Sequence, residues 1–581
     1  MDGHNLASPN TMNFLANAGN LNLGQKKFIF DNSKLNIGPN KSYKLMKEHI
    51  VSYDNIGATL NDFKNFNRDL KAYIQEKDAS MFINNLKEKA VNNEGAFFFD
   101  HCMDEHQRLT RVFWADAISR KNYSLFCDMI TFDTTFDTNK YSMVFAPITG
   151  VDNHGKCVTF GIGLLEKEDI ESFEWLFETF LKAMNNCQPP CIMTDQDPAM
   201  KVAIKNVLDK AKHRFYLEPE EFEIGWHYVI SEFDLVNDDL FKNMFNIRNM
   251  WIPSYFRDLF MGGILRSTQR SESENSFFTN FTNQHLLLVE LWFCYESAID
   301  AQRHTQDKLN ATSKTTHPQL VAPLHLEKHA ALVYTHNVFY IFKKEFKNAL
   351  YNCGIGSVTI KEEEGIEQYR IVENTRKKSY HFTYVLCSND ASCSCRMFES
   401  VGILCRHILF VIKGKFLFEI PRQYVLHRWN KEAMKKPIFG LNNNLLDGAQ
   451  KDKKQKLVGD LWYRFFSCVS LCEEKVECLE SLLSKLISFE NEMKDLESEG
   501  PVDKREAKNK HIELFVGSND IVVDILPPKK SSNKGSGSEK RKKSDKEIAI
   551  GESQKKDRLC RTCGQRANHD SRNCPQKKNP N

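Results

Sequence analysis

Two short stretches decide the fold of this chain: Phe126-Cys-Asp-Met-Ile-Thr-Phe-Asp-Thr-Thr-Phe136 and Cys191-Ile-Met-Thr-Asp-Gln-Asp197. Each is apolar enough to predict a buried strand. The first predicted strand ends at Asp133 and the second at Asp195, so each offers a carboxylate at its end. Between them, 141–152 and 158–165 predict two more strands. A helix over 170–184 follows from apolar residues at helical spacing, namely Phe173, Leu176, Phe177, Phe180, Leu181 and Met184. The predicted order is three strands, a helix, a strand and a second helix.

This order, with an Asp on the first strand and another after the fourth, is the layout of an RNase H-like core, whose carboxylates hold divalent metal for phosphodiester chemistry. Glu272 opens a predicted helix over 272–278 and offers a third carboxylate. Two Mg²⁺ or Mn²⁺ ions need anionic oxygen ligands that leave positions open for water and phosphate. From spacing alone a plainer interpretation stays equally open, because strand-end Asp residues commonly form turns or cap helices, as Asp197 before Pro198 is predicted to do.

The composition indicates a soluble, intracellular protein of several domains. With 581 residues and 41% apolar content, the chain is long enough for three or four domains with real cores. No apolar run approaches the ~18 residues that cross a bilayer, and the first 25 residues lack a signal-peptide pattern, so no membrane partner is expected. In a reducing compartment the 17 cysteines predict thiols and metal ligands before disulfides.

The basic charge is concentrated in the C-terminal tail. The net charge is +3, but residues 501–581 hold 20 Lys/Arg and 11 Asp/Glu, which is +9 and leaves the first 500 residues near −6. Within this tail, the run Lys540-Arg541-Lys542-Lys543 suits a nuclear import signal or contacts to phosphate. We therefore expect a nuclear location, although a charge run is more often only solubilising.

Six motifs between residues 45 and 435 resemble one plant family in content and in order. They are Phe113-Trp-Ala-Asp-Ala-Ile-Ser119, Phe132-Asp-Thr-Thr-Phe136, Asn139-Lys-Tyr141, Ser172-Phe-Glu-Trp-Leu-Phe177, Thr194-Asp-Gln-Asp197 and Thr268-Gln-Arg-Ser-Glu-Ser-Glu-Asn275. Together they resemble the far-red impaired response (FAR1-related) family, which derives from Mutator-like (MULE) transposases. The resemblance implies a domesticated transposase that associates with DNA and regulates light-dependent transcription. It also identifies Glu272 with the Glu of the family's Glu-Ser-x-Asn motif.

Two departures from the family pattern weigh against a working transposase. The family's Cys-x-x-Trp-His segment is missing, since His213-Arg-Phe-Tyr-Leu217 runs directly into Glu218-Pro-Glu-Glu221. The family's N-terminal Cys/His zinc module is also missing, because no cysteine precedes Cys102. We therefore expect a regulator without enzymatic activity. The alternative is an active transposase that cuts and joins DNA through Asp133, Asp195 and Glu272 with Mg²⁺ or Mn²⁺.

The strongest metal signal is Cys393-Ser-Cys395 followed, after nine residues, by Cys405-Arg-His407. A Cys-x-Cys pair on a strand places both thiols on one face, and a Cys-x-His pair at a helix start can close the tetrahedron. Three thiolates and one imidazole leave Zn²⁺ no open position, so the predicted site is structural. It resembles a SWIM-type zinc finger, which this family carries here. The competing interpretation is a set of buried free cysteines with a chance His.

A second zinc site is predicted near the C-terminus. Cys560, Cys563, His569 and Cys574 have zinc-knuckle spacing with one extra residue before the His. Zinc would fold this segment, and knuckles commonly bind single-stranded nucleic acid. A role in protein contacts stays open.

The sequence thus predicts a multidomain α/β plus α protein. Its expected parts are a loose leader (1–38), an N-terminal helical region (39–119), the RNase H-like core (120–290), a helical continuation (291–350), the SWIM region (351–435), a coiled-coil-like helix (455–498), a disordered basic linker (499–559) and the knuckle (560–575). The helix carries a short heptad seam of Leu479, Leu482, Leu486, Phe489, Met493 and Leu496. This seam predicts pairing with itself or with family members through 471–496, or packing on its own domain.

Overall fold

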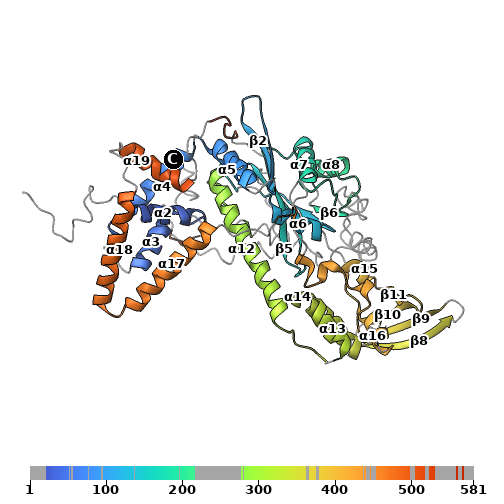
Figure 1. Ribbon diagram of the computed structural model, residues 1–581. Helices are drawn as coiled ribbons and strands as arrows, with labels where there is room; N and C mark the ends of the chain where they lie inside the picture. Colours follow the sequence, from blue (N-terminus) through green and yellow to red (C-terminus); the bar gives the residue numbers. More distant parts are fainter. Residues whose placement is uncertain are drawn as a thin grey trace, which may run out of the picture. The chain divides into compact units, whose positions relative to one another are not determined.

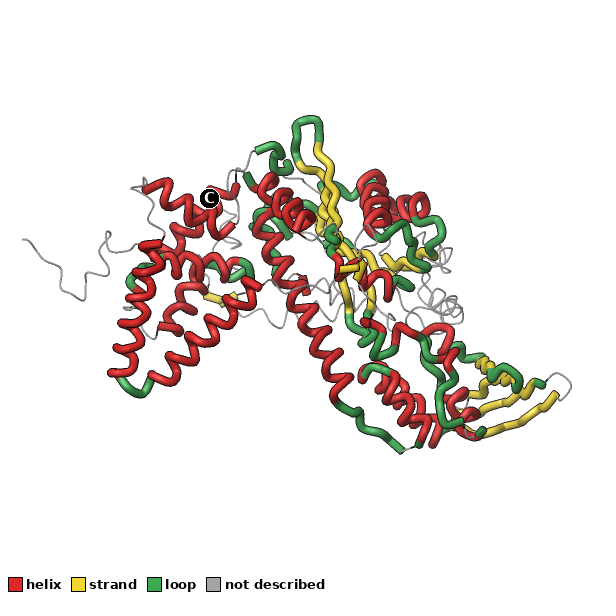
Figure 2. Tube along the Cα trace, viewed as in Figure 1, coloured by secondary structure: helices red, strands yellow, loops and turns green. Residues whose placement is uncertain are grey.

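A computed structural model gives the fold (Figures 1 and 2). It describes residues 21–50, 53, 56–75, 77–92, 96–135, 138–194, 197–215, 277–278, 281–322, 324–361, 365–374, 378–415, 417–435, 438–439, 445–446, 453–496, 504–516, 523–529, 558–559 and 566–567. The chain divides into two compact units, 1–531 and 532–581. The second unit holds one described feature, a short antiparallel pair of β14 (Arg558–Leu559) and β15 (Arg566–Ala567).

A seven-stranded mixed sheet organises the first unit, in the order β1-β2-β5-β4-β3-β6-β7. The strands are β1 (Phe98–Met103), β2 (Leu109–Ala115), β3 (Ile130–Phe132), β4 (Val144–Val151), β5 (Cys157–Leu165), β6 (Cys191–Thr194) and β7 (Lys212–Phe215). Neighbours from β1 to β3 pair antiparallel, whereas β6 runs parallel to β3 and β7 parallel to β6. The predicted succession of strands and helices is present, and β1, β2 and β7 extend the sheet at both edges.

Helices cover both faces of this sheet because its strands are apolar on both sides. On β2, Phe113 belongs to the core beneath one face and Trp114 to the core beneath the other, as the two-residue period of a strand requires. The Phe113 face packs against α6 (Ala117–Phe126), α7 (Ile170–Ala183) and α8 (Pro198–Val207).

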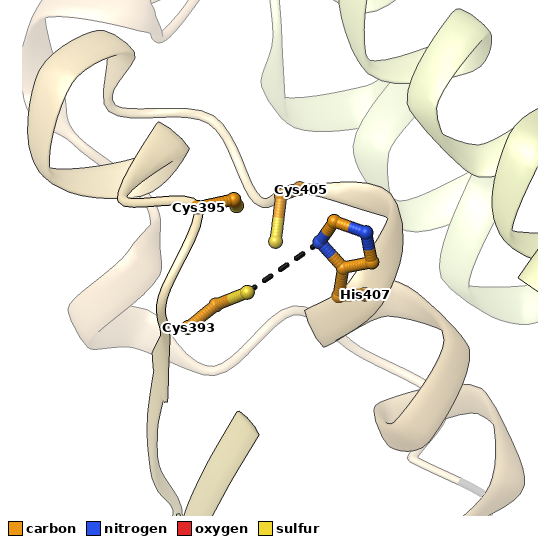
Figure 3. Close-up of side chains that lie close together, drawn as sticks. All are labelled: Cys393, Cys395, Cys405 and His407. Atoms are coloured by element: carbon orange, nitrogen blue, oxygen red, sulfur yellow. Dashed lines mark hydrogen bonds between the residues drawn. The ribbon is translucent and has the colours of Figure 1, made fainter. Parts of the chain in front are cut away.

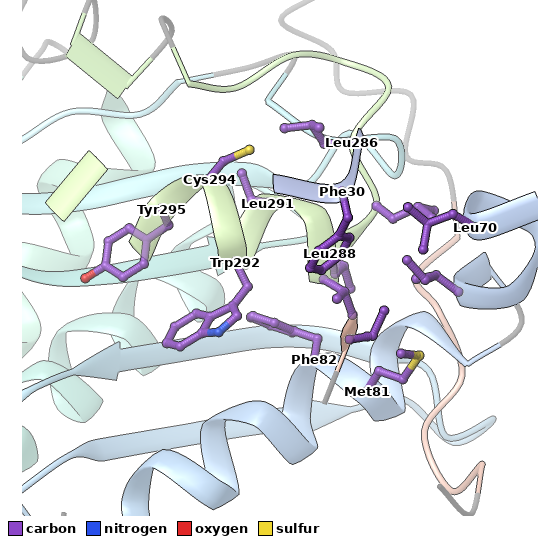
Figure 4. Packing of buried hydrophobic residues seen from close by; sticks show 14 of the residues in the cluster. Phe30, Leu70, Met81, Phe82, Leu286, Leu288, Leu291, Trp292, Cys294 and Tyr295 are labelled. Carbon is purple, nitrogen blue, oxygen red and sulfur yellow. The ribbon is translucent and has the colours of Figure 1, made fainter. Parts of the chain in front are cut away.

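The Trp114 face packs against N-terminal helices and one long later helix. These are α2 (Leu23–Ser33), α3 (Pro39–Ile50), α4 (Leu60–Gln75), α5 (Asp78–Asn92) and α12 (Leu288–Thr315). Trp292 of α12 and Phe82 of α5 meet Trp114 edge to face, with ring centroids 5.8 and 5.7 Å away. Figure 4 shows Phe82 and Trp292 within this core. The helix α12 therefore crosses the boundary at 290 that the sequence suggested between core and helical continuation.

The expectation of a loose leader is wrong for residues 22–33. Asn22 and Gln25 form a capping box, in which the Gln25 backbone N donates to Asn22 Oδ1 (2.8 Å) and the Asn22 backbone N donates to Gln25 Oε1 (2.9 Å). Ile29 and Phe30 of the resulting helix are buried. The weak apolar periodicity concealed this helix because only one short stretch of it enters the core.

The expected disordered linker from 499 is also wrong in its first part. Residues Lys504–Val516 form α19, and Ile512 is only 1% exposed. Phe515 stacks on Phe30 at 5.7 Å. Beyond it, the backbone N and O of Ile525 both bond Ser80 Oγ at 3.0 Å, and Leu526 bridges to Arg108. We call the described residues 504–516 and 523–529 the C-terminal strap, because both contact the N-terminal region of the chain.

A third core lies after α12. It is built by α13 (His325–Val333), α14 (His336–Tyr351), α15 (Met397–Val401), α16 (Arg406–Gly414) and the antiparallel sheet β11-β10-β9-β8. These strands are β8 (Cys353–Lys361), β9 (Ile366–Glu373), β10 (Lys378–Val385) and β11 (Asp390–Cys393). The alternation of apolar and polar residues over 369–372 and 380–386 is typical of short antiparallel strands, and β9 and β10 contain all of these residues but Leu386. Short 3-10 turns at 422–424, 427–429 and 433–435 follow, and β12 (Ile438–Phe439) pairs with β13 (Leu445–Leu446).

The single coiled-coil-like helix expected over 455–498 is two helices. They are α17 (Lys453–Cys472) and α18 (Val476–Leu496), which contact each other across a short turn. Their large apolar side chains are widely exposed, including Trp462 (57%) and Phe489 (57%). Across the described residues, none of the helices combines the length and apolarity that a bilayer span needs.

Candidate functional site

The four predicted zinc ligands lie together at the junction of β11 and α16 (Figure 3). Cys393 ends β11, Cys405 is the N-cap residue of α16, and His407 lies in the first turn of that helix. The four ligand atoms of Cys393, Cys395, Cys405 and His407 all lie within 4.8 Å of one another. The structure therefore brings together a ligand set that the spacing alone predicted.

Two left-handed residues turn the chain between the ligand pairs. Arg396 has a φ of 51°, and its backbone N donates to Cys393 O at 2.9 Å. Gly402 has a φ of 75° and ends α15, a conformation that favours glycine because it has no Cβ. This turn folds the 394–404 loop back so that Cys405 faces the end of β11.

The donor set fits a tetrahedral Zn²⁺ site. Zn–S bonds of about 2.3 Å and Zn–N bonds of about 2.0 Å place neighbouring ligand atoms roughly 3.5–3.8 Å apart. Cys393 Sγ lies 3.4 Å from His407 Nδ1. Hydrogen bonds from the thiols of Cys393 and Cys405 lower the pKa of Cys395, whereas burial raises the pKa of Cys405. One thiolate held by two thiols is an arrangement in which a bound cation can displace the remaining protons.

His407 is oriented by the buried Glu373 and the half-buried Tyr380. Its Nε2 lies 2.9 Å from Glu373 Oε1, and the ring of Tyr380 stacks on the imidazole with centroids 4.1 Å apart. With the proton on Nε2 and donated to Glu373, Nδ1 presents its lone pair to the sulfur atoms. A carboxylate behind a ligating imidazole fixes its tautomer and raises its basicity.

The residue between Cys405 and His407 ties the site to α14. Arg406 donates from its backbone N and Nε to Glu345 Oε2 (3.0 and 2.9 Å) and from Nη2 to Glu345 Oε1 (2.7 Å). Its Nη1 lies 3.6 Å from Glu373 Oε1. The start of α16 is thus held by two buried carboxylates, which restricts movement of the ligand pair.

The predicted carboxylate site is described only in part. Asp133 directly follows β3, and β6 ends at Thr194, the residue before Asp195. Because β3 and β6 are parallel with Thr131 opposite Met193, the ends of these two strands lie at the same edge of the sheet. Asp195 and Glu272 are outside the described residues, so their convergence with Asp133 stays a prediction. At the same edge, Asp197 Oδ1 accepts from the Met200 backbone N at 2.8 Å, and this residue is the helix cap that the sequence predicted.

The basic run Lys540–Lys543 and the knuckle ligands Cys560, Cys563, His569 and Cys574 also lie outside the described residues. Their neighbours are informative, because Arg558 pairs with Ala567 and Leu559 with Arg566. In the sequence, this antiparallel pair flanks residues 560–565, which include Cys560 and Cys563.

Comparisons with known proteins identify two domains in this chain. Residues 129–217 match the MULE transposase domain, and 385–413 match the SWIM zinc finger. In Arabidopsis thaliana, Protein FAR1-RELATED SEQUENCE 9 is 32% identical over 388 residues, covering 60% of this chain and 69% of the relative. Protein FAR-RED IMPAIRED RESPONSE 1 is 30% identical over 442 residues, covering 69% and 52%. The chain belongs to the FAR1-related family.

This FAR1-related chain aligns with only part of some relatives. Its match to Protein FAR1-RELATED SEQUENCE 5 of Arabidopsis thaliana, 28% identical over 475 residues, covers 75% of this chain and 59% of that protein. The chain therefore spans somewhat more than half of the length of the relatives matched over the longest stretches. We therefore treat the activity and the partners of the full-length relatives only as proposals for this chain.

Sequence reasoning missed Glu373 as a functional residue. It ends β9 and is 2% exposed. It shares a strand face with Ile371, which is fully buried, because side chains two residues apart point to the same side. A charged residue in a buried alternating position was the available signal, since buried carboxylates require a partner.

Proposed function

We propose that this FAR1-related chain is a nuclear, zinc-binding, DNA-associated regulator of light-dependent transcription, domesticated from a MULE transposase. The observation that carries the proposal is the closed Cys393/Cys395/Cys405/His407 site built into the same unit as the MULE-matching sheet. Four protein ligands make such a site structural. Its fitting role is to hold a binding surface in shape.

We also propose that the MULE-matching sheet is an RNase H-like core. The order β5-β4-β3-β6-β7 supports this, with three antiparallel strands followed by two parallel ones. The helices α7 and α8 follow β5 and β6 in the chain and cover one face of the sheet. This is the succession in which strand-end carboxylates can meet.

Genomic occupancy of the full-length protein tests the regulator function. We expect discrete bound sites for the wild type and their loss in Cys405→Ser, with Cys387→Ser, an exposed cysteine outside the site, unaffected. Changing Lys540–Lys543 to Ala is expected to move a tagged protein from the nucleus to the cytoplasm. Wild-type occupancy no different from that of an untagged control contradicts the proposal. If the variant with Lys540–Lys543 changed to Ala stays nuclear, this run is not the import signal.

A second candidate function is an active transposase, favoured by Asp133 at the end of β3 beside the end of β6. We propose little or no strand transfer, since a misplacement of about 1 Å can cost roughly a hundredfold in rate. The test is an excision and joining assay with purified protein, Mg²⁺ or Mn²⁺ and DNA bearing Mutator-like terminal repeats. Metal-dependent cleavage that is abolished by Asp133→Ala or Glu272→Ala would show that the protein is an active transposase.

A partner for the helical hairpin completes the proposal. The helices α17 and α18 expose apolar seams that no described part of the chain buries, with Phe489 57% and Met493 43% exposed. The heptad spacing of α18 suits a second helix pair of the same kind. We propose that a second copy of this chain covers the hairpin.

A further inference from the structure

The exposed face of α14 carries tyrosine and lysine in a single row. Tyr340, Lys344, Lys347 and Tyr351 are spaced by four, three and four residues, which places them on one side of a helix. All four are exposed, with Tyr340 at 50% and Tyr351 at 66%. We call these four residues the α14 stripe.

The acidic residues of α13 and α14 are buried. Glu345 of α14 is buried and binds Arg406. Glu327 of α13 is 0% exposed and accepts from the backbone N of Val321 and of Ala322 at 2.7 and 2.9 Å. No other carboxylate occurs in either helix, and Lys328 of α13 is exposed. The outward charge of α13 and α14 is therefore entirely positive.

A hollow of 330 Å³ continues the α14 stripe onto the central sheet. It is lined by the β4–β5 turn and the start of α14, including His154, Lys156, Asn337 and Tyr340. Lys156 is exposed at this turn. His154 is 2% exposed, and its Nδ1 has no hydrogen-bond partner among the described residues, while its Nε2 lies 2.8 Å from Asn310 Oδ1. An unmatched buried polar atom in a hollow between basic residues indicates a polar ligand.

We infer that Lys156 and the α14 stripe bind the phosphate backbone of duplex DNA, an inference that rests on the DNA association proposed above. Lysine ammonium and tyrosine hydroxyl groups both donate hydrogen bonds to phosphate oxygens. At 1.5 Å per residue the stripe is about 16 Å long, which matches roughly five steps of a strand at 3.4 Å each. Its position between the central sheet and the zinc module lets the zinc site hold the stripe through the Arg406–Glu345 contact.

Two other ligands fit this face less well. The tyrosines at its ends stand about 16 Å apart with lysines between them, too far to stack successive bases of a single strand, which lie about 3.4 Å apart. A protein partner would require an apolar centre that is depleted of charge, whereas lysines occupy the centre of this stripe. A row of hydrogen-bond donors that contains no carboxylate matches a row of phosphates.

Fluorescence anisotropy with the full chain and a 20-base-pair duplex, from 50 to 200 mM KCl, tests the inference. The variant is Lys156→Gln/Lys344→Gln/Lys347→Gln. Its matched control is Lys41→Gln/Lys44→Gln/Lys64→Gln, which removes three exposed lysines from α3 and α4. Because each lost phosphate contact lowers the salt slope by about 0.9, we expect the variant to bind roughly tenfold or more weakly at 50 mM and to lose about 2–3 from the slope. The control should bind like the wild type.

The possible outcomes separate this inference from the function on which it rests. Failure of the wild type to bind any duplex overturns the DNA association itself. Binding by the wild type and the triple variant with equal affinity and slope overturns only the α14 surface. Competition by polyglutamate as effective as unlabelled duplex assigns the face to an acidic protein and overturns the inference as well. If the triple variant loses zinc or helical signal, the single variants Lys344→Gln and Lys347→Gln are measured instead. Each is expected to lower the salt slope of duplex binding by about one.

Discussion

At the scale of single residues, the zinc site depends on a contact that the ligand motif does not contain. Glu373 lies 34 residues from His407 in sequence, and its Oε1 is 2.9 Å from the imidazole Nε2. If the carboxylate holds the Nε2 proton, the ligand nitrogen facing the sulfur atoms is fixed before zinc arrives. Glu373 is therefore a positioning residue for His407.

Glu373→Ala should weaken zinc binding about 10- to 100-fold, because a carboxylate behind a ligating His contributes about that much. Glu373→Gln should have a smaller effect, since its amide oxygen can still accept from Nε2. Affinity is measured by chelator competition in a background with Cys560→Ser and Cys563→Ser. Glu367→Gln, on the same strand but paired with Lys415, is the control. Equal affinity in all variants would refute the positioning role.

Asp78 predicts a dependence of stability on pH. Its Oδ2 and Oδ1 accept from the backbone N of Leu288 (2.8 Å) and Val289 (2.9 Å) at the start of α12. Burial nevertheless raises its pKa from 3.8 to about 6. Because the folded state holds the proton more tightly, stability from this group is full below pH ~3.8 and is lost as pH rises through about 6.

Denaturant unfolding between pH 3.5 and 7 measures this loss, expected at about 3 kcal/mol for a shift of roughly two units. Asp78→Asn should remove the pH-dependent part, since an amide does not titrate here. Asp31→Asn, which changes a half-exposed carboxylate on α2, should keep it. A variant Asp78→Asn with the wild-type pH profile would assign the dependence to other groups.

These residues show what the sequence could and could not reveal. The ligands of the SWIM site lie within 15 residues, so local spacing was sufficient to predict them. Glu373 and Asp78 act on partners 34 and 210 residues away. Such pairs follow from tertiary packing, which a single sequence does not encode in any local pattern.

At the scale of elements, the C-terminal strap shows how little sequence signal a docked helix needs. In α19, Ile512 and Val516 are buried, whereas Leu514 is 67% exposed. Charged residues fill much of the remaining helix, so composition indicated a linker. The apolar surface that accepts the strap comes from distant helices, where Phe30 stacks on Phe515 and Glu513 accepts from the Tyr73 hydroxyl at 2.7 Å.

Ile512→Ala should lower the free energy of unfolding by about 2–4 kcal/mol, because it leaves a cavity in a packed site. Leu514→Ala, two positions away on the exposed side of α19, should change it by less than about 0.5 kcal/mol. Denaturant unfolding followed by tryptophan fluorescence reports the difference, since Trp114 and Trp292 belong to the same core. Equal small effects would mean that the strap is not docked in solution.

The α17–α18 hairpin should make the chain a dimer. Phe489→Glu/Met493→Glu places two charges in the exposed seam of α18 and should convert the dimer to a monomer, because buried unpaired charges are strongly unfavourable. Asn491→Glu adds a charge on the face of the same helix opposite the seam and should leave the dimer intact. Light scattering coupled to size exclusion gives the mass. A wild-type monomer at micromolar concentration would contradict self-association through this hairpin.

At the scale of the whole molecule, the segment 428–430 contacts both the zinc module and the central sheet, as does the start of α14, where Asn337 Nδ2 donates to His154 O at 2.8 Å. Arg428 pairs with Asp128 and donates from Nη2 to Val151 O at 2.6 Å. Trp429 Nε1 donates to Val401 O at 3.0 Å, and Asn153 Nδ2 donates to Asn430 O at 3.2 Å. Residues 428–430 thus contact both the α15 end of the zinc module and the β4–β5 region.

The sequence predicted the succession of strands and the zinc module, but not this arrangement. Apolar runs indicated β3 to β6, and alternation is visible in β9 and β10, because those signals are local. The joins between parts depend on polar contacts such as Arg428 with Asp128, 300 residues apart. An arginine in a mixed basic stretch gives no sign in the sequence that it will be buried.

Because residues 428–430 connect two separately packed cores, we predict that removal of zinc destabilises the third core and leaves the central sheet folded. Chelation should expose 390–412 and the β9–β10 hairpin to hydrogen exchange, because the third core loses the ligands that close its loop. Strands β4 and β5, which belong to the other two cores, should keep their protection. Loss of protection across the whole chain would mean that zinc supports the sheet as well.

Arg428→Ala tests the joint without touching the zinc site. Arg428 is buried and Asp128 is half-buried, so removing the guanidinium should cost less than the roughly 3–5 kcal/mol of a fully buried pair. The β4–β5 turn should exchange faster while zinc stays bound. Arg422→Ala, which changes an exposed arginine six residues earlier in the chain, is the matched control. If Arg428→Ala releases zinc as well, the module and the sheet fold as one cooperative body. If Arg428→Ala keeps zinc and its β4–β5 turn exchanges at the same rate as in Arg422→Ala, residues 428–430 do not couple the two parts.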